Sequence, residues 1–561
     1  MRLTPAYPAL ALVAGLALAP SDAAACGGFF CNSAQPVNQA AERIVFARGA
    51  DGSVTAVIQI QYRGPSERFA WMLPVNGSPT IGVSSNLAFQ RLQSATNPQY
   101  ILNTTVEGSC RESDFFASPQ AGGASDASAP AADAGAGSVT VLDRGSVGPY
   151  DYVILEVDPA ASDVTQAAVD WLHAESFDVP ETGADRIRDY LESGMNLLAF
   201  RLTKGNDAGS IRPVTIGFGS GLPSIPIRPT ALAATDDMGV MVWVLGEHRA
   251  VPVNYLSLEL NDALINWLNP SSNYNDVVTR AANEAGGQGF VTEMAGAAGP
   301  LAQTIYPTWE ADSWAYLSTT DWSADHGGLL QQALGTFGQH DGMRDVLAST
   351  VPLPAGVSRD DFLSCPFCYA SFSEAHIDGF DPAAFLAAMR TQVIEPHEAT
   401  SRLFWQSPYV TRLYTTMSAW EMTLDPIFDE NASLPAVSTI HTADRVIECS
   451  PSIDRFDAPW RITLPNGSVV RGAGNTWPFS ITGEVPAVSV SRRVGSDGVG
   501  RIVTDNRPAI EQAIRTQNAT VPVVRHAGGC SVSRATAPGL PGFALVGIAL
   551  GWVLRRRRGV A

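Results

Sequence analysis

The chain has 561 residues, a formal net charge of -19 and seven cysteines. This length predicts roughly two to four domains with buried cores. Hydrophobic residues at 45% and charged residues at 16% exclude a chain that is disordered throughout. The acidic balance argues against nucleic acid as a partner and against adsorption of the folded body to anionic lipid, because both need a basic face.

The N-terminus has the three parts of a secretory signal peptide. Arg2 supplies the positive charge, Ala9 to Ala19 form an apolar core, and an A-x-A cleavage site ends at Ala25. The apolar run is shorter than the ~20 residues that a membrane span needs. We therefore predict that residues 1–25 are removed by a signal peptidase, which leaves Cys26 first. Lipidation of Cys26 is the alternative, although an alanine stands where a lipobox favours leucine.

The C-terminus combines a cysteine, an apolar segment and an arginine cluster. Residues 535–554 are mainly apolar and are long enough, at about 30 Å as a helix, for a transmembrane segment. Arg555 to Arg558 follow and should stay cytoplasmic. With Gly528-Gly529-Cys530-Ser531 upstream, this order resembles the C-terminal sorting tail of myxobacterial surface proteins. The resemblance implies cleavage near Cys530 by a sorting protease and display at the outer surface. A plain single-pass anchor is the alternative.

Residues 26–260 carry the patterns of an α+β domain. Asp51-Gly52 is a hairpin signal, and the alternating strand after it, with a third strand over 69–75, predicts an antiparallel meander. Residues 117–138 lack large apolar side chains and predict a disordered insert. The further expected elements are strands over 150–157, 196–202, 214–218 and 240–245 and helices that begin at Asp163 and near Ala184.

We expect residues 261–400 to be mainly helical and residues 401–525 to be β-rich. A helical pattern over 264–268 ends at Asn269-Pro270, Asn275 is the expected cap of the next helix, and a helix begins at Asp381-Pro382 and stops at Pro396. Strands follow over 461–464, 488–494 and 501–504. The predicted fold class is therefore α+β, with antiparallel sheets, inserted helices and a sorting tail over 526–561.

Several segments together resemble a bacterial secreted family that is a domain of unknown function. The resemblance covers most of residues 26–260 and implies secretion and an α+β fold, but it supplies no catalytic residues. The segments that carry it are Cys26 to Cys31 (Cys-Gly-Gly-Phe-Phe-Cys), Tyr62 to Pro65, Leu73 to Val75, Gly194 to Phe200, Ile225 to Arg228 and Val242 to Leu245.

Cys365-Pro366-Phe367-Cys368 is the most specific local motif. It resembles the redox centre of thioredoxin-like oxidoreductases, in which the first thiol is activated at a helix N-terminus. No βαβ pattern surrounds it, and the nearby Asp360 and Asp361 would raise a thiol pKa. A zinc site with His376 would need further soft ligands. A structural disulfide is the favoured interpretation, and the redox and metal interpretations remain as alternatives.

The cysteine count agrees with disulfides in an oxidising compartment. If Cys530 is set aside for processing, six cysteines remain to pair: Cys26, Cys31, Cys110, Cys365, Cys368 and Cys449. Cys26 and Cys31 are our preferred local pair.

Other candidate motifs are weaker. The eight histidines do not cluster in the sequence, and His397-Glu398 lacks the second histidine of H-E-x-x-H. Acidic groups at Asp321 to Asp325 and at Asp425, Asp429 and Glu430 could bind a cation, but exposed turns are the favoured interpretation. The aromatic residues between Tyr306 and Trp322 could form a binding platform, although core packing is favoured. We assign no catalytic, cofactor-binding or metal-ligating residue and no cofactor.

Two functions compete at this point. The first is a surface-displayed cell-envelope protein that acts by binding or as a structural component. The second is a secreted enzyme, either a thiol-disulfide oxidoreductase that uses Cys365 and Cys368 or a hydrolase with dispersed residues. Export, paired cysteines and the lack of a catalytic signature favour the first.

Overall fold

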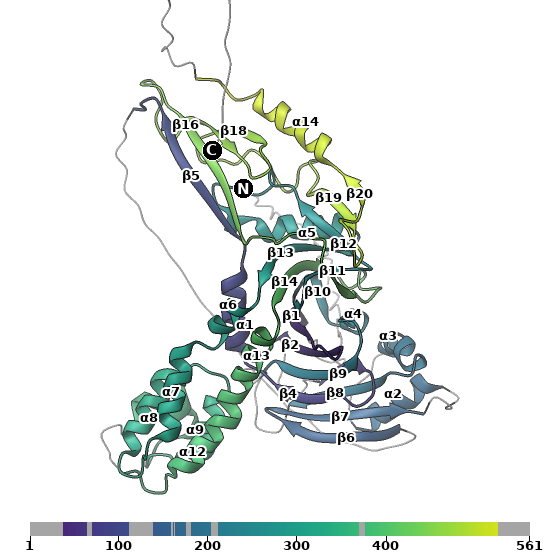
Figure 1. The fold of residues 1–561 in the computed structure, drawn as a ribbon, viewed down its shortest axis with the longest axis vertical. Coiled ribbons are helices and arrows are strands. Elements are labelled where there is room, and N and C mark those ends of the chain that lie inside the picture. Colours follow the sequence, from purple (N-terminus) through teal and green to yellow (C-terminus); the bar gives the residue numbers. More distant parts are fainter. Residues whose placement is uncertain are drawn as a thin grey trace, which may run out of the picture.

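A computed structural model of the chain (Figure 1) describes residues 38–63, 70–111, 139–158, 161, 163–175, 181–202, 211–369 and 376–524. The predicted signal peptide, the predicted insert over 117–138 and the predicted sorting tail lie outside the described residues. Runs of strands and runs of helices alternate along the chain, and the predicted α+β class is confirmed. None of the helices within the described ranges is both long and apolar enough to cross a bilayer.

A mixed ten-stranded sheet forms the centre of the molecule. Strands on both sides of residues 260 and 400 contribute to it, so the α+β, helical and β-rich segments expected from the sequence share one sheet. In spatial order the strands are β20 (Arg501–Asp505), β19 (Val488–Arg493), β12 (Leu256–Leu260), β13 (Gly289–Ala297), β14 (Tyr409–Met417), β10 (Ala234–Gly246), β1 (Asn38–Arg48), β2 (Ser53–Arg63), β9 (Val214–Ser220) and β4 (Thr80–Val83). β1 pairs in parallel with β10, and β12 with β13; the other pairs are antiparallel.

The predicted hairpin at Asp51-Gly52 joins β1 to β2, and Gly52 has the positive φ of +81° that the turn requires.

The predicted antiparallel meander is wrong in its third strand. β3 (Ala70–Val75) leaves the central sheet and pairs with β8 (Asn196–Leu202). The neighbour of β2 is instead β9, from much later in the chain. Alternation fixes which face of a strand is buried, but it does not name the partner strand.

A second sheet packs against one face of the central sheet. Its order is β3-β8-β7-β6, with β7 at Tyr150–Val157 and β6 at Val139–Val147. Along β8, Leu198 and Phe200 join the core shared with the central sheet, whereas Leu197 and Ala199 pack under α2 (Val164–Ala174) and α3 (Glu181–Glu192). The Asp163 carboxylate accepts hydrogen bonds from two backbone N–H groups at the start of α2, as predicted.

Helices cover the opposite face of the central sheet. Val45 and Ala47 of β1 pack there against α1 (Asn86–Thr96), α6 (Gly299–Ile305) and α13 (Glu395–Gln406). Ile44 and Phe46, which alternate with them, face the second sheet. The central sheet is therefore buried on both faces at β1, whereas its edge strand β20 is exposed.

A third sheet has the order β18-β17-β16-β5, and its strands are β18 (Val469–Ala473), β17 (Pro459–Thr463), β16 (Ile440–Glu448) and β5 (Gln99–Glu107). The parallel pair β5 and β16 brings distant segments together, and a disulfide between Cys110 and Cys449 follows directly after them. Arg461 of β17 forms ion pairs with Glu107 and Glu448 on both strands. A small sheet pairs β11 (Arg249–Pro252) with β15 (Phe428–Asn431).

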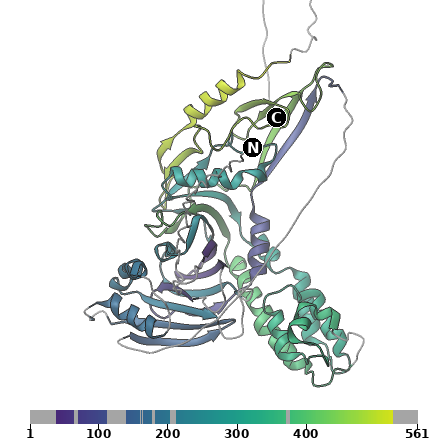
Figure 2. The same ribbon diagram turned by 180° about the vertical axis from the view of Figure 1, so that it is seen from behind.

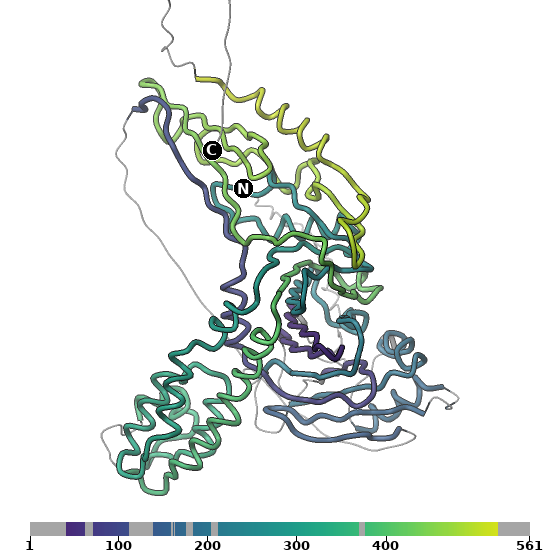
Figure 3. The backbone as a smooth tube through the Cα atoms, viewed as in Figure 1, coloured from purple at the N-terminus to yellow at the C-terminus, as the bar shows by residue number. Residues whose placement is uncertain are grey.

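The helices over 308–394 form a separate lobe, which we call the arm; the rest of the described protein is the body. The arm projects from the body and lies apart from the second sheet in both views (Figures 1 and 2). Figure 3 shows the chain entering the arm after α6 and leaving it through α13. The arm has a separate hydrophobic core. It contains α7 (Thr308–Thr319), α8 (His326–Phe337), α9 (Met343–Thr350), α10 (Arg359–Ser364), α11 (Pro366–Tyr369), α12 (Pro382–Met389) and the π-helical segment η4 (Arg390–Ile394).

Three expected helix boundaries are corrected. The helix that begins at Asp381 does not stop at Pro396, because η4 carries it into α13 and places Pro396 in the first turn, where no N–H is needed. Residues 264–268 form turns rather than a helix. α5 (Tyr274–Glu284) begins after Asn273 instead of Asn275. The short η3 (Pro270–Ser272), α4 (Ile227–Thr230) and the late α14 (Arg507–Asn518) complete the described helices.

A buried ion pair joins two neighbouring strands of the central sheet. Arg412 of β14 lies 2.6 Å from Glu293 of β13, and both side chains are almost fully buried. The Tyr274 hydroxyl donates to the Glu293 carboxylate, and the Arg412 guanidinium lies over the Trp243 ring. Burial raises the pKa of Glu293, although Arg412 and Tyr274 act in the opposite direction.

We expect Glu293→Gln to destabilise the fold by about 3–5 kcal/mol, because it leaves the Arg412 charge buried without a counter-charge. Replacing both partners, as in Glu293→Leu with Arg412→Met, should recover most of this loss. Urea unfolding at neutral pH measures the difference. The control is Glu511→Gln, because Glu511 pairs with Arg515 at the exposed surface and should give no measurable change. Equal stability of Glu293→Gln and the wild type would contradict this account.

Candidate functional site

In the Cys365-Pro366-Phe367-Cys368 motif, Cys365 follows α10 directly, and the other three residues belong to the short helix α11 of the arm. The structure joins Cys365 to Cys368 in a disulfide. Cys365 is half-buried and Cys368 is exposed. The motif follows α10 rather than a strand, so its setting differs from that of a thioredoxin-like centre. Asp360 and Asp361 are exposed in the preceding helix.

The remaining cysteine predictions divide into two groups. Cys110 and Cys449 are joined in the second disulfide, which spans 339 residues of sequence. Cys26, Cys31 and Cys530, with the cleavage position Ala25, lie outside the described residues. The preferred pairing of Cys26 with Cys31 and the processing at Cys530 therefore stay predictions.

The acidic groups considered as cation ligands have protein partners instead. Asp325 caps α8, and Asp425 accepts hydrogen bonds from the Tyr190 hydroxyl and from two backbone N–H groups. Glu430 accepts hydrogen bonds from the backbone of residues 247 and 248. These contacts explain the carboxylates as caps and as links between loops.

The aromatic residues of the arm divide between core and surface. Tyr306, Trp314 and Trp322 are buried in the arm core, whereas Trp309 and Tyr316 are exposed on α7 at 57% and 53%. Core packing therefore explains three of the five, and two remain available at the surface.

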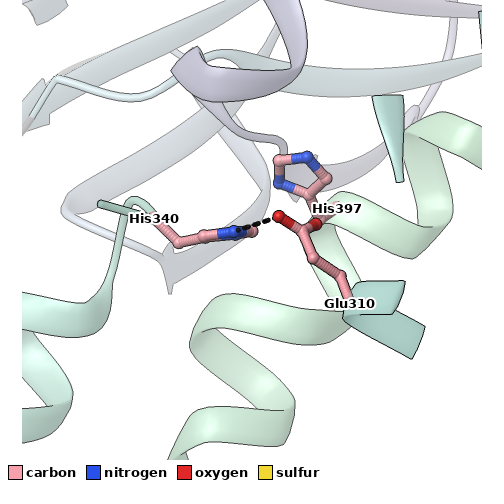
Figure 4. A group of neighbouring side chains, drawn as sticks. All are labelled: Glu310, His340 and His397. Carbon is pink, nitrogen blue, oxygen red and sulfur yellow. Dashed lines mark hydrogen bonds and ion pairs between the residues drawn. The ribbon is translucent and has the colours of Figure 1, made fainter. Parts of the chain in front are cut away.

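Three residues that the sequence did not single out as a site meet where the arm joins the body. Glu310 in the first turn of α7, His340 in the turn between α8 and α9, and His397 in the first turn of α13 are all buried. The two imidazole rings lie 4.8 Å apart between centroids (Figure 4). The histidines lie apart in the sequence, but the fold brings two of them together. With Arg91 of α1, we call these residues the junction cluster.

Arg91 and His340 bind the Glu310 carboxylate directly. Arg91 donates hydrogen bonds to both carboxylate oxygens, at 2.9 Å and 2.5 Å. Nε2 of His340 lies 3.1 Å from one of the same oxygens. Arg91 also donates to the backbone carbonyl of Ile305. One carboxylate therefore connects a helix of the body with two segments of the arm.

His397 is held in place by a hydrogen bond from Nε2, the ring nitrogen that points away from Glu310. Nε2 lies 2.9 Å from the Ile305 carbonyl oxygen, so this nitrogen carries the ring proton and donates it. Nδ1 has no hydrogen-bond partner among the described residues, and neither has Nδ1 of His340. In Figure 4 the near nitrogen of His397 faces the Glu310 carboxylate and His340.

The electrostatics keep the carboxylate charged and His397 neutral. Burial alone would raise the pKa of Glu310, but the hydrogen bonds from Arg91 and His340 lower it to about 2. Burial, together with His340 and Arg91, lowers the pKa of His397 to about 3. The cluster therefore offers an ionised carboxylate beside an imidazole with a free lone pair.

The turn that carries His340 is fixed by its neighbours. Asp341 accepts hydrogen bonds from the backbone N–H groups of Asn86 and Leu87 and thereby caps α1. Gly342 has a φ of +82° and packs against the Gln392 carbonyl of η4, where Arg212 also donates a hydrogen bond. The position of His340 is thus set by contacts with the body on one side and the π-helical segment on the other.

The junction cluster has the composition of a metal site. Two imidazoles and one carboxylate form a ligand set that zinc proteins use, and one ligand atom from each residue lies within 4.8 Å of the others. A positioned imidazole beside a carboxylate is also suited to proton transfer, but all three residues are buried. Among the described residues, Glu310, His340 and His397 form a group that could hold a metal ion.

A family model described as an uncharacterized protein conserved in bacteria (DUF2330) matches residues 20–304, just over half of the chain. The chain belongs to this family. The resemblance seen over residues 26–260 is therefore confirmed and extended. No curated protein and no solved structure gives a significant match. Of the junction cluster, Arg91 alone falls in the matched span, and the other three residues follow it.

No local motif could have revealed the cluster. His340 stands 30 residues after Glu310, and His397 belongs to another helix still further along the chain. His397 carried one signal, because it stands beside Glu398, but it has no second histidine four residues on. Only the packing of α7, α9 and α13 brings the three residues together.

We expect Gly342→Ala to loosen the arm. The left-handed conformation costs an L-residue about 1–2 kcal/mol, and a Cβ at this position would also collide with the Gln392 carbonyl oxygen. Gly356→Ala is the matched control, because Gly356 has a φ of +81° and no atom near its added Cβ. Thermal unfolding and limited proteolysis should show the larger loss for Gly342→Ala. Equal losses would mean that the backbone conformation alone sets the effect.

Proposed function

We propose that this protein is exported and displayed at the cell surface, where it acts as a binding or structural component of the envelope. The disulfide between Cys110 and Cys449 is the observation that carries the proposal. It closes a sheet between segments 339 residues apart. Disulfides of this kind form and persist outside the reducing cytosol, so the fold suits an oxidising compartment.

In this proposal, the predicted signal peptide and the predicted sorting tail direct the chain to the cell surface. Cleavage after Ala25 by signal peptidase releases the mature N-terminus. The apolar segment over 535–554 then holds the chain in the membrane until a sorting protease cuts near Cys530. In this scheme the membrane is a transient partner and the ligand of the displayed body is still to be found.

The surface of the arm favours binding over a purely structural role. Trp309 and Tyr316 are seven residues apart, so they project from the same side of α7. Trp405 of α13 is also exposed, at 57%. Exposed large aromatic side chains are enriched at binding surfaces, because they bury much area with little loss of side-chain entropy.

Cell fractionation with mass spectrometry of both chain ends tests export and sorting. We expect the wild-type chain in the surface fraction to begin at Cys26 and end near residue 530, with Cys110 and Cys449 oxidised. Cys530→Ala should keep the arginine cluster and remain in the inner membrane. Cys365→Ser is the matched control, because it also removes a cysteine but should sort normally. An intact chain in the cytoplasm with free thiols would overturn the proposal.

A thiol-disulfide oxidoreductase is the second candidate, and the exposure of Cys368 favours it. An exposed sulfur can be attacked by a thiolate, which a buried structural disulfide resists. Equilibration of the purified protein with glutathione buffers, followed by alkylation, measures the reduction potential of the Cys365–Cys368 pair. A potential below about -300 mV indicates a structural bond, and a value near those of oxidoreductases, roughly -270 to -120 mV, supports the enzyme.

A further inference from the structure

We propose that Glu310, His340 and His397 form a binding site for one divalent transition-metal ion, with zinc as the preferred ion. This goes beyond export and display, since a surface protein needs no metal to reach its destination. The donor set of two imidazoles and a carboxylate is one that zinc uses in proteins. All three side chains are buried, so the site would be enclosed by protein.

The separations of the donor atoms fit a single ion. At bond lengths of about 2.0–2.2 Å, two tetrahedral zinc ligands stand roughly 3.3 Å apart. Nε2 of His340 and the nearest oxygen of Glu310 are already 3.1 Å apart. The three donor atoms lie within 4.8 Å of one another, so the widest pair has to close by no more than about 1.5 Å.

The contacts of His397 are those of a metal ligand. Metal-binding histidines usually donate the second ring N–H to a carboxylate or a backbone carbonyl, which fixes the ring and leaves the other nitrogen for the metal. His397 donates from Nε2 to Ile305, and its Nδ1 is buried without a hydrogen-bond partner among the described residues. An unsatisfied buried acceptor is costly, and coordination would relieve that cost.

His340 can bind the same metal ion if its ring proton moves from one nitrogen to the other. As a donor to Glu310, it carries its proton on Nε2. When Nε2 becomes a ligand, the proton moves to Nδ1, which has no hydrogen-bond partner among the described residues. Arg91 keeps the Glu310 carboxylate ionised and oriented from outside, because each carboxylate oxygen has lone pairs for more than one partner.

A π-helical segment and a shallow surface groove lie next to the cluster. The π-helical segment η4 ends just before His397, and such segments occur often at functional sites because they re-aim the side chains that follow. A shallow groove opens beside the cluster and is lined by Leu87, Gln90, Arg91, Ser94, Ala95 and Thr304. The guanidinium of Arg91 thus connects the carboxylate to the surface.

A metal ion here would crosslink three segments at the base of the arm. Its ligands come from α7, from the turn before α9 and from α13, while Arg91 ties the same carboxylate to α1 of the body. We therefore expect bound zinc to raise the melting temperature and to slow proteolysis at the base of the arm, since a ligand that binds only the folded state stabilises it.

Calorimetric titration with Zn²⁺ tests the site in the full-length chain, purified in detergent and stripped with a chelator. We expect one zinc ion per chain in the wild type. His397→Ala should weaken binding at least 100-fold, since it removes one of the three ligands. His326→Ala is the matched control, because His326 is also a buried histidine of the arm, where its Nδ1 accepts a backbone N–H. It should bind zinc as the wild type does.

A second measurement covers the case in which His397→Ala does not fold. X-ray absorption of the zinc-loaded wild type should report two imidazoles and a carboxylate oxygen in the coordination shell, and Glu310→Gln should lose the carboxylate. The proposal is overturned if the wild type takes up no zinc at micromolar concentrations. It is equally overturned if folded His397→Ala and His340→Gln bind zinc as the wild type does.

Discussion

The ion pair between Arg91 and Glu310 is the constraint around which the arm and the body are joined. A carboxylate with no solvent exposure needs a counter-charge, and the structure supplies it from α1, which packs on the central sheet. Because Arg91 belongs to the body and Glu310 to the arm, a displacement of the arm that separated them would leave the buried carboxylate without this counter-charge. The turn at His340 follows from this placement, since Asp341 caps α1 and Gly342 meets the π-helical segment. The arm has its own hydrophobic core, so polar contacts at its base carry much of the orientation.

A second buried pair, Glu293 with Arg412, joins β13 to β14 inside the central sheet, where the pairing register shifts between Thr292 and Met294. Apolar side chains would fill the same space, but they tolerate alternative packings, whereas a buried charge tolerates one partner. The disulfide between Cys110 and Cys449 acts in the same way at the third sheet, where β5 and β16 come from opposite ends of the chain. The central sheet and the third sheet thus each contain a link between segments that are far apart in the sequence. Such links stabilise contacts between distant segments, which this fold needs because its central sheet contains strands from residue 38 to residue 505.

The sequence predicted what depends on near neighbours. The strands over 150–157 and 196–202 have the expected bounds, because a short run of apolar and aromatic residues between turn signals marks a buried strand directly. Asp163 and Asp381 cap helices as expected, since a cap acts within three residues. The partner of β2, the passage through Pro396 and the meeting of Glu310, His340 and His397 were missed. Each depends on residues brought together by the whole fold, and the π-helical segment that aims His397 has no simple sequence signal.

The two kinds of chemistry in this chain fit one environment. Thiols are the softest zinc ligands in proteins, but they pair as disulfides in an oxidising compartment and are then lost to a metal. Four cysteines of the described residues are paired in this way. Imidazole and carboxylate are insensitive to the same oxidation, so a metal site that is to persist outside the cytosol is best built from them. The three proposed ligands in the junction cluster are all of these two kinds, and they lie where the arm has no disulfide to the body among the described residues. A metal ion there and a disulfide at the third sheet would serve the same physical end: each adds a link that holds distant segments without requiring a larger hydrophobic core.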